Sequence, residues 1–274
     1  MEKLLDEIES YWSTRTEGYS EVNHKELAGT QKNAWLKVLT SQFPDKPKEE
    51  IRILDIGTGP GFFPVILAEA GYHVDAVDYT EGMLEKAKEN AGDLCRNIRF
   101  LRMDAQKLDF EDNTFDVVIS RNLTWNLEHP DVAYREWVRV LKVGGRLLNF
   151  DANWYGYLYE EEQRKAYEND RKNVENNSLD DHYLCTDIER MERIALQVPL
   201  SKISRPQWDV KTLREAGLLG IRTDTEIWKT VWSEEERLNY QSTPMFMVTG
   251  VKPDHFLNLP VAAGEKTEGF LELG

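Results

Sequence analysis

Cysteine is scarce in this sequence, and long apolar runs are missing from it. The two cysteines, Cys95 and Cys185, form no C-x-x-C pair, which argues against a disulfide framework and a cysteine-rich zinc site. This composition fits a reducing compartment, so we expect a cytoplasmic protein. The best apolar run, residues 62–68, is too short to span a bilayer, and the charged residues 1–10 do not resemble a signal peptide.

Basic residues are also in the minority. Lys and Arg number 34 against 49 Asp and Glu, a net charge of -15, and no basic cluster stands out from the acidic background. Such a surface repels nucleic-acid phosphates and anionic lipid headgroups, so we expect neither a nucleic acid nor a membrane as partner. Because 41% of the residues are hydrophobic, a normal packed core is expected.

Short apolar segments alternate with amphipathic ones through the first half of the chain. The alternation predicts strands at 51–56, 72–77, 98–103, 115–120 and 146–150, with helices at 62–70, 81–91 and 132–141. The pair Gly144-Gly145 is predicted to be the turn before the fifth strand. Strands that alternate with helices imply right-handed crossovers and an α/β fold with a mostly parallel sheet.

The segments on either side of this core differ from it. Residues 1–46 are predicted to be an N-terminal helical cap, broken at Gly18 and Gly29, ahead of the core at 47–156. Residues 157–204 are polar, acidic and mostly helical, and they interrupt the alternation as a lid-like insertion. The alternation returns in residues 205–252, with strands near 221–231 and 245–251, and residues 253–274 form a tail.

A glycine-rich turn joins the first strand of the core to its first helix. Gly57, Gly59 and Gly61 allow the backbone to approach a ligand closely. The dinucleotide fingerprint G-x-G-x-x-G would need its third glycine at position 62, where this chain has Phe62. Asp55, just before the turn, is poorly placed beside a pyrophosphate and suits a ligand with an ammonium group instead. The tail of S-adenosylmethionine has an amine and a carboxylate but no phosphate.

Two further acids follow the next two strands. Asp78 ends the second strand, where an acid in Rossmann-type sheets accepts hydrogen bonds from ribose hydroxyls. Asp104 follows the third strand, where a carboxylate can accept a hydrogen bond from the adenine amine. Tyr79 and Met83 are placed to pack on the adenine. These elements lie at the carboxyl ends of successive strands, where open α/β sheets bind ligands.

Five segments in a fixed order now point to one family. The order DIGTGPGF, VDYTEGML, RMDAQKLDF, FDVVISRN and EWVRVLKVGGRLL resembles the class I S-adenosylmethionine-dependent methyltransferases, in their small-molecule, methyltransferase type 11-like branch. The resemblance covers residues 50–151 closely and the last two strands more weakly. It implies a Rossmann-like, doubly wound, seven-stranded sheet with a helical insertion after the fifth strand.

The resemblance also implies a cofactor and a substrate class. We expect S-adenosylmethionine as cofactor, S-adenosylhomocysteine as its product, a small-molecule acceptor, no metal, and a monomer or homodimer. The N-terminal Tyr11, Trp12 and Tyr19 resemble the segment that folds over the cofactor in many such enzymes. The expected cofactor-binding residues are Tyr11, Tyr19, Asp55, Gly57, Thr58, Gly59, Gly61, Asp78, Tyr79, Met83, Asp104, Ala105 and Arg121.

The loop after the fourth strand should face the methyl group. Many relatives place a histidine or an aromatic residue there, whereas this chain has Asn122, Trp125 and Asn126. A thiolate or neutral amine acceptor needs no strong base, but a hydroxyl or a carbon acid does. Asp151, after the fifth strand, and His129 are then the candidates. The catalytic residues we predict are Asn122, Trp125 and Asp151, with Trp154, Tyr155 and Tyr157 in the substrate wall.

Other interpretations remain open at this point. Asp180, Asp181, His182 and Cys185 form a grouping that resembles a metal site only faintly. A non-methylating enzyme that uses S-adenosylmethionine, or a regulatory relative that only binds it, is the main alternative function. Such an enzyme would need extra acids after the fourth strand to hold a second amine, and the sequence has none there. A nicotinamide-dependent oxidoreductase fits the glycine spacing poorly.

Overall fold

The computed structural model describes residues 3–183 and 186–254. Its strands are Arg52–Ile56 (β1), His73–Asp78 (β2), Ile98–Arg102 (β3), Phe115–Arg121 (β4), Leu141–Asp151 (β5), Leu219–Asp224 (β6) and Phe246–Val251 (β7). They form one seven-stranded sheet in the order β3-β2-β1-β4-β5-β7-β6. Strands β1 to β5 pair in parallel, and β7 is antiparallel to both β5 and β6. The predicted α/β, Rossmann-like, doubly wound fold is confirmed.

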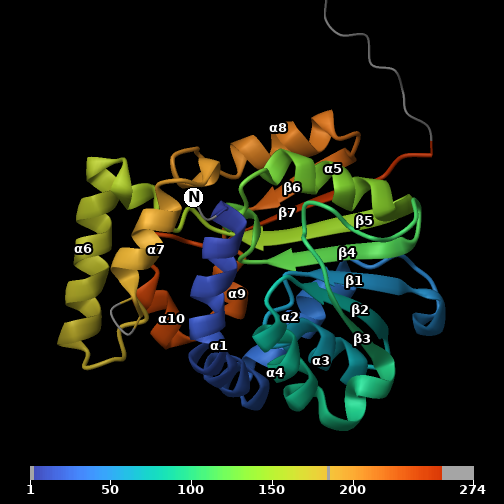
Figure 1. Cartoon of the computed structure of the whole chain (residues 1–274), viewed down its shortest axis with the longest axis horizontal. Coiled ribbons are helices and arrows are strands. Elements are labelled where there is room, and N and C mark those ends of the chain that lie inside the picture. Colours follow the sequence, from blue (N-terminus) through green and yellow to red (C-terminus); the bar gives the residue numbers. More distant parts are fainter. Residues whose placement is uncertain (1–2, 184–185, 255–274) are drawn as a thin grey trace, which may run out of the picture.

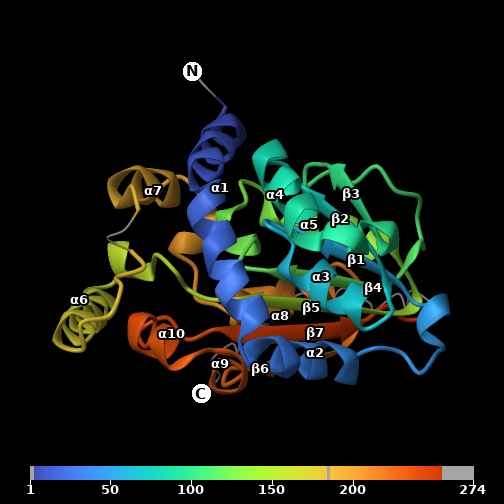
Figure 2. The ribbon, with the colours of Figure 1, turned by 90° about the horizontal axis from the view of Figure 1, so that it is seen from below.

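Helices cover both faces of this sheet (Figures 1 and 2). Ile53 of β1 is buried in one core and Leu54 in the other, so the strand is apolar on both sides, as buried parallel strands are. One face carries α2 (Gln31–Ser41), α3 (Phe62–Glu69), α4 (Glu81–Ala91) and α9 (Trp228–Val231). The other face carries α5 (Pro130–Val140) and α8 (Gln207–Glu215).

The N-terminal helix α1 spans Leu4–Ala28 without interruption, so the predicted break at Gly18 is wrong. A glycine inside a helix costs about 1 kcal/mol, which packing against neighbouring helices can offset. Here α1 packs against α4 and against α7 (Ile188–Ala195). The helix does end before Gly29, as expected. In both ribbon views α1 lies between the sheet and a group of helices at the left (Figures 1 and 2).

That group of helices contains the insertion that follows β5. It comprises α6 (Glu161–Asn176) and α7, and the later helix α10 (Glu234–Asn239) packs against α6. Short 3-10 helices complete the chain at Lys48–Glu50, Gly92–Asn97, Thr124–Asn126, Gly156–Leu158 and Pro199–Ser201. In the described part of the chain, no helix is both long and apolar enough to cross a membrane.

Two predicted boundaries are wrong. The strand expected at 221–231 ends at Asp224, because Ile227 and Val231 lie four residues apart and bury the same face of α9. The strand expected at 146–150 begins at Leu141, so Gly144-Gly145 lies inside β5, at a register shift against β4, and is not a turn before the strand. Most of the predicted tail lies outside the described residues.

Candidate functional site

The glycine turn between β1 and α3 needs glycine for two separate reasons. Gly57, Gly59 and Gly61 all have φ in the left-handed region, at 70°, 53° and 90°. A Cβ on Gly57 would also lie 2.7 Å from Leu123 Cδ2, and one on Gly61 would lie 3.0 Å from Ala87 Cβ. The backbone of this turn is therefore held close to the loop after β4 and to helix α4.

Asp78 anchors the turn from the end of β2. Its Oδ2 accepts a hydrogen bond from the Gly59 N–H at 2.9 Å, and its Oδ1 accepts one from the Thr80 N–H at 2.9 Å. Burial raises the pKa of this carboxyl, while the hydrogen bonds from Thr80 and Gly59 oppose the rise. Each oxygen keeps a further lone pair, so Asp78 can position the turn and still accept hydrogen bonds from a ligand.

A cavity of about 100 Å³, partly open to solvent, lies over this turn. Ten of the residues predicted to act in the site line it, from the ends of four strands and from helices α1 and α4. They are Tyr19, Gly57, Gly59, Asp78, Tyr79, Met83, Asp104, Ala105, Arg121 and Asn122. The predicted residues Tyr11, Asp55, Thr58 and Gly61 do not line this cavity.

Asp55 lies buried behind the turn, with 2% of its surface exposed. Burial raises its pKa to about 7, although the neighbouring Thr58 side chain and the charge of Arg121 oppose the rise. The carboxyl group is thus close to the point at which it changes charge near neutral pH. A cation bound on the other side of the turn would favour its charged form.

Helix α1 supplies a wall of this cavity that the sequence indicated only through its aromatic residues. Leu5, Ile8, Glu9 and Trp12 line the cavity beside Tyr19. The rings of Trp12 and Tyr19 meet edge to face, 5.8 Å apart. Five further residues line the cavity, and the sequence singles out only Asn126 among them: Gln106, Leu123, Asn126, Leu127 and Glu128.

Ion pairs hold α1 over the site. Arg121, at the end of β4, binds Glu26 of α1 through two hydrogen bonds of 2.7 and 3.1 Å, and it lies over the rings of Trp35, Phe62 and Phe63. Burial disfavours the charge of Arg121, but Glu26 more than compensates, so the pKa of the guanidinium rises. Because Arg121 is already paired, its place in the site is to join α1 to the sheet.

A second, larger cavity of about 680 Å³, also partly open to solvent, adjoins the first. The two cavities share Trp12, Tyr19, Arg121 and Asn122 in their walls. The larger one is strongly aromatic. Its rings come from α1, the loop after β4, the segment after β5, the insertion and the region around α10: Tyr11, Trp12, Tyr19, Trp125, Trp154, Tyr155, Tyr183, Trp232 and Tyr240.

Two predicted catalytic residues lie beside this junction. Asn122 has φ at 56°, and its buried Oδ1 has no hydrogen-bond partner among the described residues. Trp125 packs on Tyr155 with ring centroids 5.0 Å apart, and its indole N–H donates to the Asn122 carbonyl at 3.0 Å. Asn122 faces both cavities, while Trp125 and Tyr155 line the larger one.

The prediction of Asp151 as a base is wrong. Its side chain has 0% exposure, pairs with Arg205 at 2.7 Å and accepts hydrogen bonds from the Trp125 backbone N–H and the Trp154 indole N–H. Asp151 lines neither cavity, so it positions the two tryptophans. His129 is the N-cap residue of α5, with 62% of its side chain exposed, and is no base for this site either.

Tyr157 also lies outside the predicted wall. Its ring stacks on Tyr167 with centroids 4.1 Å apart, and its hydroxyl donates to Glu192 at 2.8 Å. These contacts place Tyr157 in the small core of the insertion. Among the described residues, no group of three or more His, Cys, Asp or Glu side chains is arranged to hold a metal ion.

Comparison with known proteins gives the class of this site. The family model described as a methyltransferase domain matches residues 54–149. A putative S-adenosylmethionine-dependent methyltransferase from Methanococcus maripaludis has the same fold, with a TM-score of 0.59 and 20% identity over 89% of this chain and 95% of its own. Phosphoethanolamine N-methyltransferase 2 of Haemonchus contortus, solved with S-adenosylmethionine, aligns with a TM-score of 0.57 and 19% identity over 81% of this chain and 52% of its own.

Relatives by sequence are methyltransferases as well. A demethylmenaquinone methyltransferase from Renibacterium salmoninarum is 31% identical over 148 residues, which are 54% of this chain and 60% of the relative. A ubiquinone/menaquinone biosynthesis C-methyltransferase from Pseudomonas putida is 41% identical over 103 residues, 35% of this chain and 40% of the relative. The chain thus spans about half the length of the curated relatives it matches. It contains a class I S-adenosylmethionine-dependent methyltransferase domain, as predicted.

Proposed function

We propose that the chain transfers a methyl group to a small-molecule acceptor by in-line displacement. The observation that carries this proposal is the junction of two cavities at Tyr19 and Asn122, one over the glycine turn and one with aromatic walls. When bound, S-adenosylmethionine supplies an electrophilic methyl group on a sulfonium. The chain's own task is to hold the donor and the acceptor in line and to exclude water.

The residues of the first cavity fit this cofactor. Gly59 leaves free the space between its backbone and the Tyr19 ring. A Cβ on this residue would fill part of that space, because it would lie 3.5 Å from the ring. We assign the amino-acid end of the cofactor to the turn at Gly57 and Gly59, with Asp55 behind it. We assign the ribose hydroxyls to Asp78. The adenine is assigned to Tyr79, Met83, Asp104 and Ala105.

Four of the predicted cofactor contacts take other roles in this proposal. Thr58 and Gly61 shape the turn but do not face the cavity, and Tyr11 faces only the larger cavity. Arg121 holds α1 in place through Glu26. We propose that α1 and the insertion form a lid, because Arg190 of α7 donates to Ser10 of α1 at 2.9 Å.

The larger cavity is assigned to the acceptor. Trp125, Trp154 and Tyr155 supply flat apolar surfaces, which suit an aromatic or extended apolar molecule. The alternative, a protein that binds the cofactor without transferring the methyl group, would have no need of this second aromatic chamber. The loop after β4 offers the amides Asn122 and Asn126 to the first cavity, together with the carboxylate of Glu128, so the expectation of no acid in this loop is wrong and the loop does not argue against the alternative.

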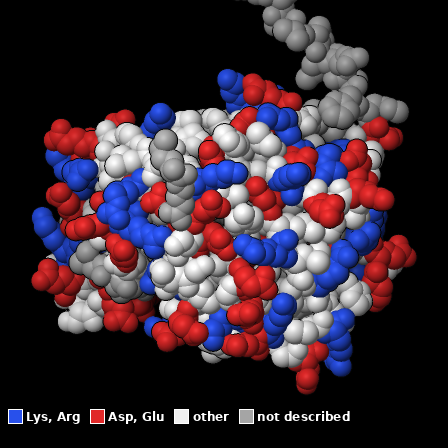
Figure 3. All heavy atoms as spheres, viewed as in Figure 1, with Lys and Arg blue, Asp and Glu red and all other residues white. Residues whose placement is uncertain are grey.

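The surface charge does not favour a nucleic acid or a membrane as partner. Acidic and basic side chains are interleaved over the face drawn in Figure 3, without a continuous basic stripe, and the net charge is -15. We propose a cytoplasmic enzyme that acts as a monomer or homodimer without nucleic acid or membrane.

The proposal is tested by isothermal titration calorimetry. We expect S-adenosylhomocysteine to bind in the micromolar range and NAD to show no heat of binding. Binding of NAD without binding of S-adenosylhomocysteine would refute the proposal.

A further inference from the structure

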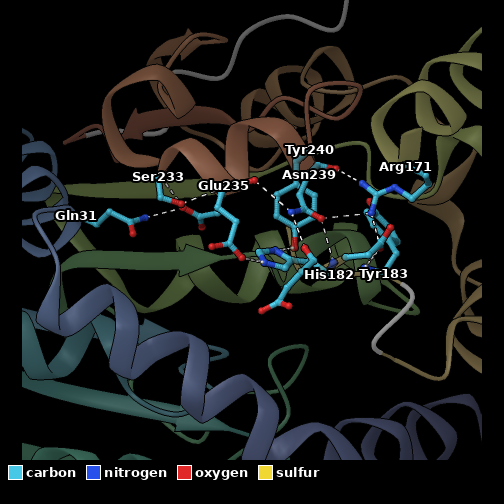
Figure 4. Close-up of polar contacts among 11 residues, drawn as sticks. Gln31, Arg171, His182, Tyr183, Ser233, Glu235, Asn239 and Tyr240 are labelled. Carbon is cyan, nitrogen blue, oxygen red and sulfur yellow. Dashed lines mark hydrogen bonds and ion pairs between the residues drawn. The ribbon is translucent and has the colours of Figure 1, made fainter. Parts of the chain in front are cut away.

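Glu235, His182 and Tyr240 form a chain of hydrogen bonds in the wall of the larger cavity (Figure 4). His182 Nε2 lies 2.9 Å from Glu235 Oε1, and His182 Nδ1 lies 3.0 Å from the Tyr240 hydroxyl. With its proton on Nε2, the imidazole donates to the carboxylate and accepts from the phenol. We call these three residues the proton relay. In this arrangement the Tyr240 hydroxyl can pass its proton to His182 Nδ1.

The relay is held in place from two segments far apart in the sequence. Glu235 and Asn239 lie one turn apart on α10, and Tyr240 follows directly. The Asn239 side chain accepts from the His182 backbone N–H at 3.0 Å and donates to the Asp180 carbonyl at 3.1 Å. These bonds fix the short segment 180–183 of the insertion against α10, and with it the orientation of the imidazole.

The surroundings of Tyr240 keep it a neutral phenol. Burial raises the pKa of its hydroxyl well above the usual value, and Tyr183, Glu236 and Tyr19 raise it further. Tyr240 is therefore suited to pass a proton on and does not act as a resident phenolate. The other titratable groups around the relay come from α1, the end of β4, α6, the insertion and α10: Tyr19, Glu26, Arg121, Arg171, Asp180, Asp181, Tyr183 and Glu236.

The rings beside Tyr240 favour a flat acceptor. Trp154 and Trp232 lie with their centroids 5.2 and 5.6 Å from the Tyr240 ring. Of the histidines that the structure describes, His182 is the one that lines either cavity. A group that can accept a proton and a surface that can stack on an aromatic ring thus occur in the same wall.

We propose that the relay removes a proton from the methyl acceptor, and that the acceptor is a phenol- or enol-type hydroxyl compound. This inference rests on the proposed function. The acceptor O–H proton passes to the Tyr240 oxygen while the Tyr240 proton passes to His182 Nδ1, and Glu235 neutralises the resulting imidazolium. The electron pair released on the acceptor forms the bond to the methyl carbon, at the oxygen or at the conjugated ring carbon. The sulfur–methyl bond breaks, and its electron pair stays on sulfur. Tyr240 is the catalytic residue, and His182 and Glu235 are positioning residues that act through it.

Chromogenic phenols test this inference without knowledge of the natural acceptor. The probes are 4-nitrophenol and 4-nitro-1-naphthol, added to the full chain saturated with S-adenosylhomocysteine, and the readout is the visible absorbance of the phenolate across pH. We expect a bound probe to ionise about one pH unit or more below the free probe, because the relay takes up its proton. Tyr240→Phe and His182→Gln should abolish this shift.

Two matched variants serve as controls. Tyr159→Phe removes an exposed hydroxyl, and His129→Gln changes an exposed histidine; neither residue lines a cavity, so both should keep the shift. Calorimetry with S-adenosylhomocysteine checks that each variant is folded and loaded. If the wild-type chain does not bind S-adenosylhomocysteine, the proposed function fails and the inference fails with it.

If S-adenosylhomocysteine binds to the wild-type chain, the results with the two phenols test the relay alone. Failure of both phenols to bind would overturn the inference, and so would a bound probe that ionises as it does in water. A shift that survives Tyr240→Phe would also overturn it. In each of these cases the proposed methyltransferase activity would still stand.

Discussion

Asp78→Ala tests how the glycine turn and the cofactor depend on each other. The substitution removes the acceptor of two backbone hydrogen bonds, from the Gly59 and Thr80 N–H groups, each 2.9 Å long. A hydrogen bond to a charged group contributes about 1.5–3 kcal/mol, and water can replace part of it at this half-buried position. We therefore expect the free energy of unfolding to fall by roughly 1–3 kcal/mol in urea denaturation.

The same substitution should weaken the cofactor by a similar amount. Loss of the ribose acceptor predicts a decrease of about 1–3 kcal/mol in binding free energy, or roughly 5- to 150-fold in the Kd for S-adenosylhomocysteine. Calorimetry measures this directly. Asp75→Ala is the matched control, since Asp75 lies on the same strand but pairs with Arg99 at 2.7 Å, away from the cavity. Unchanged affinity in Asp78→Ala would show that the ribose is held elsewhere.

Four further predictions follow from the geometry. Gly61→Ala should destabilise the fold by roughly 1–3 kcal/mol, because φ is 90° and the new Cβ would lie 3.0 Å from Ala87 Cβ; a urea midpoint equal to that of wild type would contradict this. The raised folded-state pKa of Asp55, about 7, means that the folded state binds a proton which the unfolded state releases from about pH 4 upward. The stability that the Asp55 proton contributes is thus present below the unfolded pKa and is lost as pH rises toward 7. Asp55→Asn should flatten this part of the pH profile of the free energy of unfolding. A profile identical to that of wild type would argue against a buried carboxyl. Hydrogen exchange should show added protection by S-adenosylhomocysteine in α1 and in the insertion as well as at residues 57–61, whereas protection of the glycine turn alone would exclude the lid. In a filter assay at physiological salt, tRNA and duplex DNA should show no saturable binding below micromolar concentration, since the net charge is -15.

Local patterns allowed the central part of the site to be predicted. The left-handed φ of Gly57, Gly59 and Gly61 follows from a strand–turn–helix that only glycine fits, and that spacing can be read directly along the chain. Asp78 and Asp104 are predicted to lie near each other because the carboxyl ends of parallel strands meet at one edge, and both line the first cavity. These inferences need only residues that lie close together in the sequence, or strands whose order the fold class determines.

Long-range contacts account for what could not be predicted. The pairing of Arg121 with Glu26 joins residues 95 positions apart, and that of His182 with Glu235 joins residues 53 apart. Asp151 looked available for catalysis because nothing in its own segment shows that Arg205 would neutralise it. The relay cannot be predicted from the sequence for the same reason, although His182 stands beside Asp180 and Asp181 there. A local signal for α10 did exist in the capping box from Ser233 to Glu236.

The central claim is that this chain transfers a methyl group to a small molecule that fits the larger cavity. The most direct measurement incubates the protein with methyl-labelled S-adenosylmethionine and a metabolite extract, and identifies labelled products by mass spectrometry. We predict a labelled small molecule, formed in step with S-adenosylhomocysteine and absent when Asp78→Ala replaces the wild type at limiting cofactor. Cofactor binding without any labelled small molecule, or a label found only in protein or nucleic acid, would contradict the account.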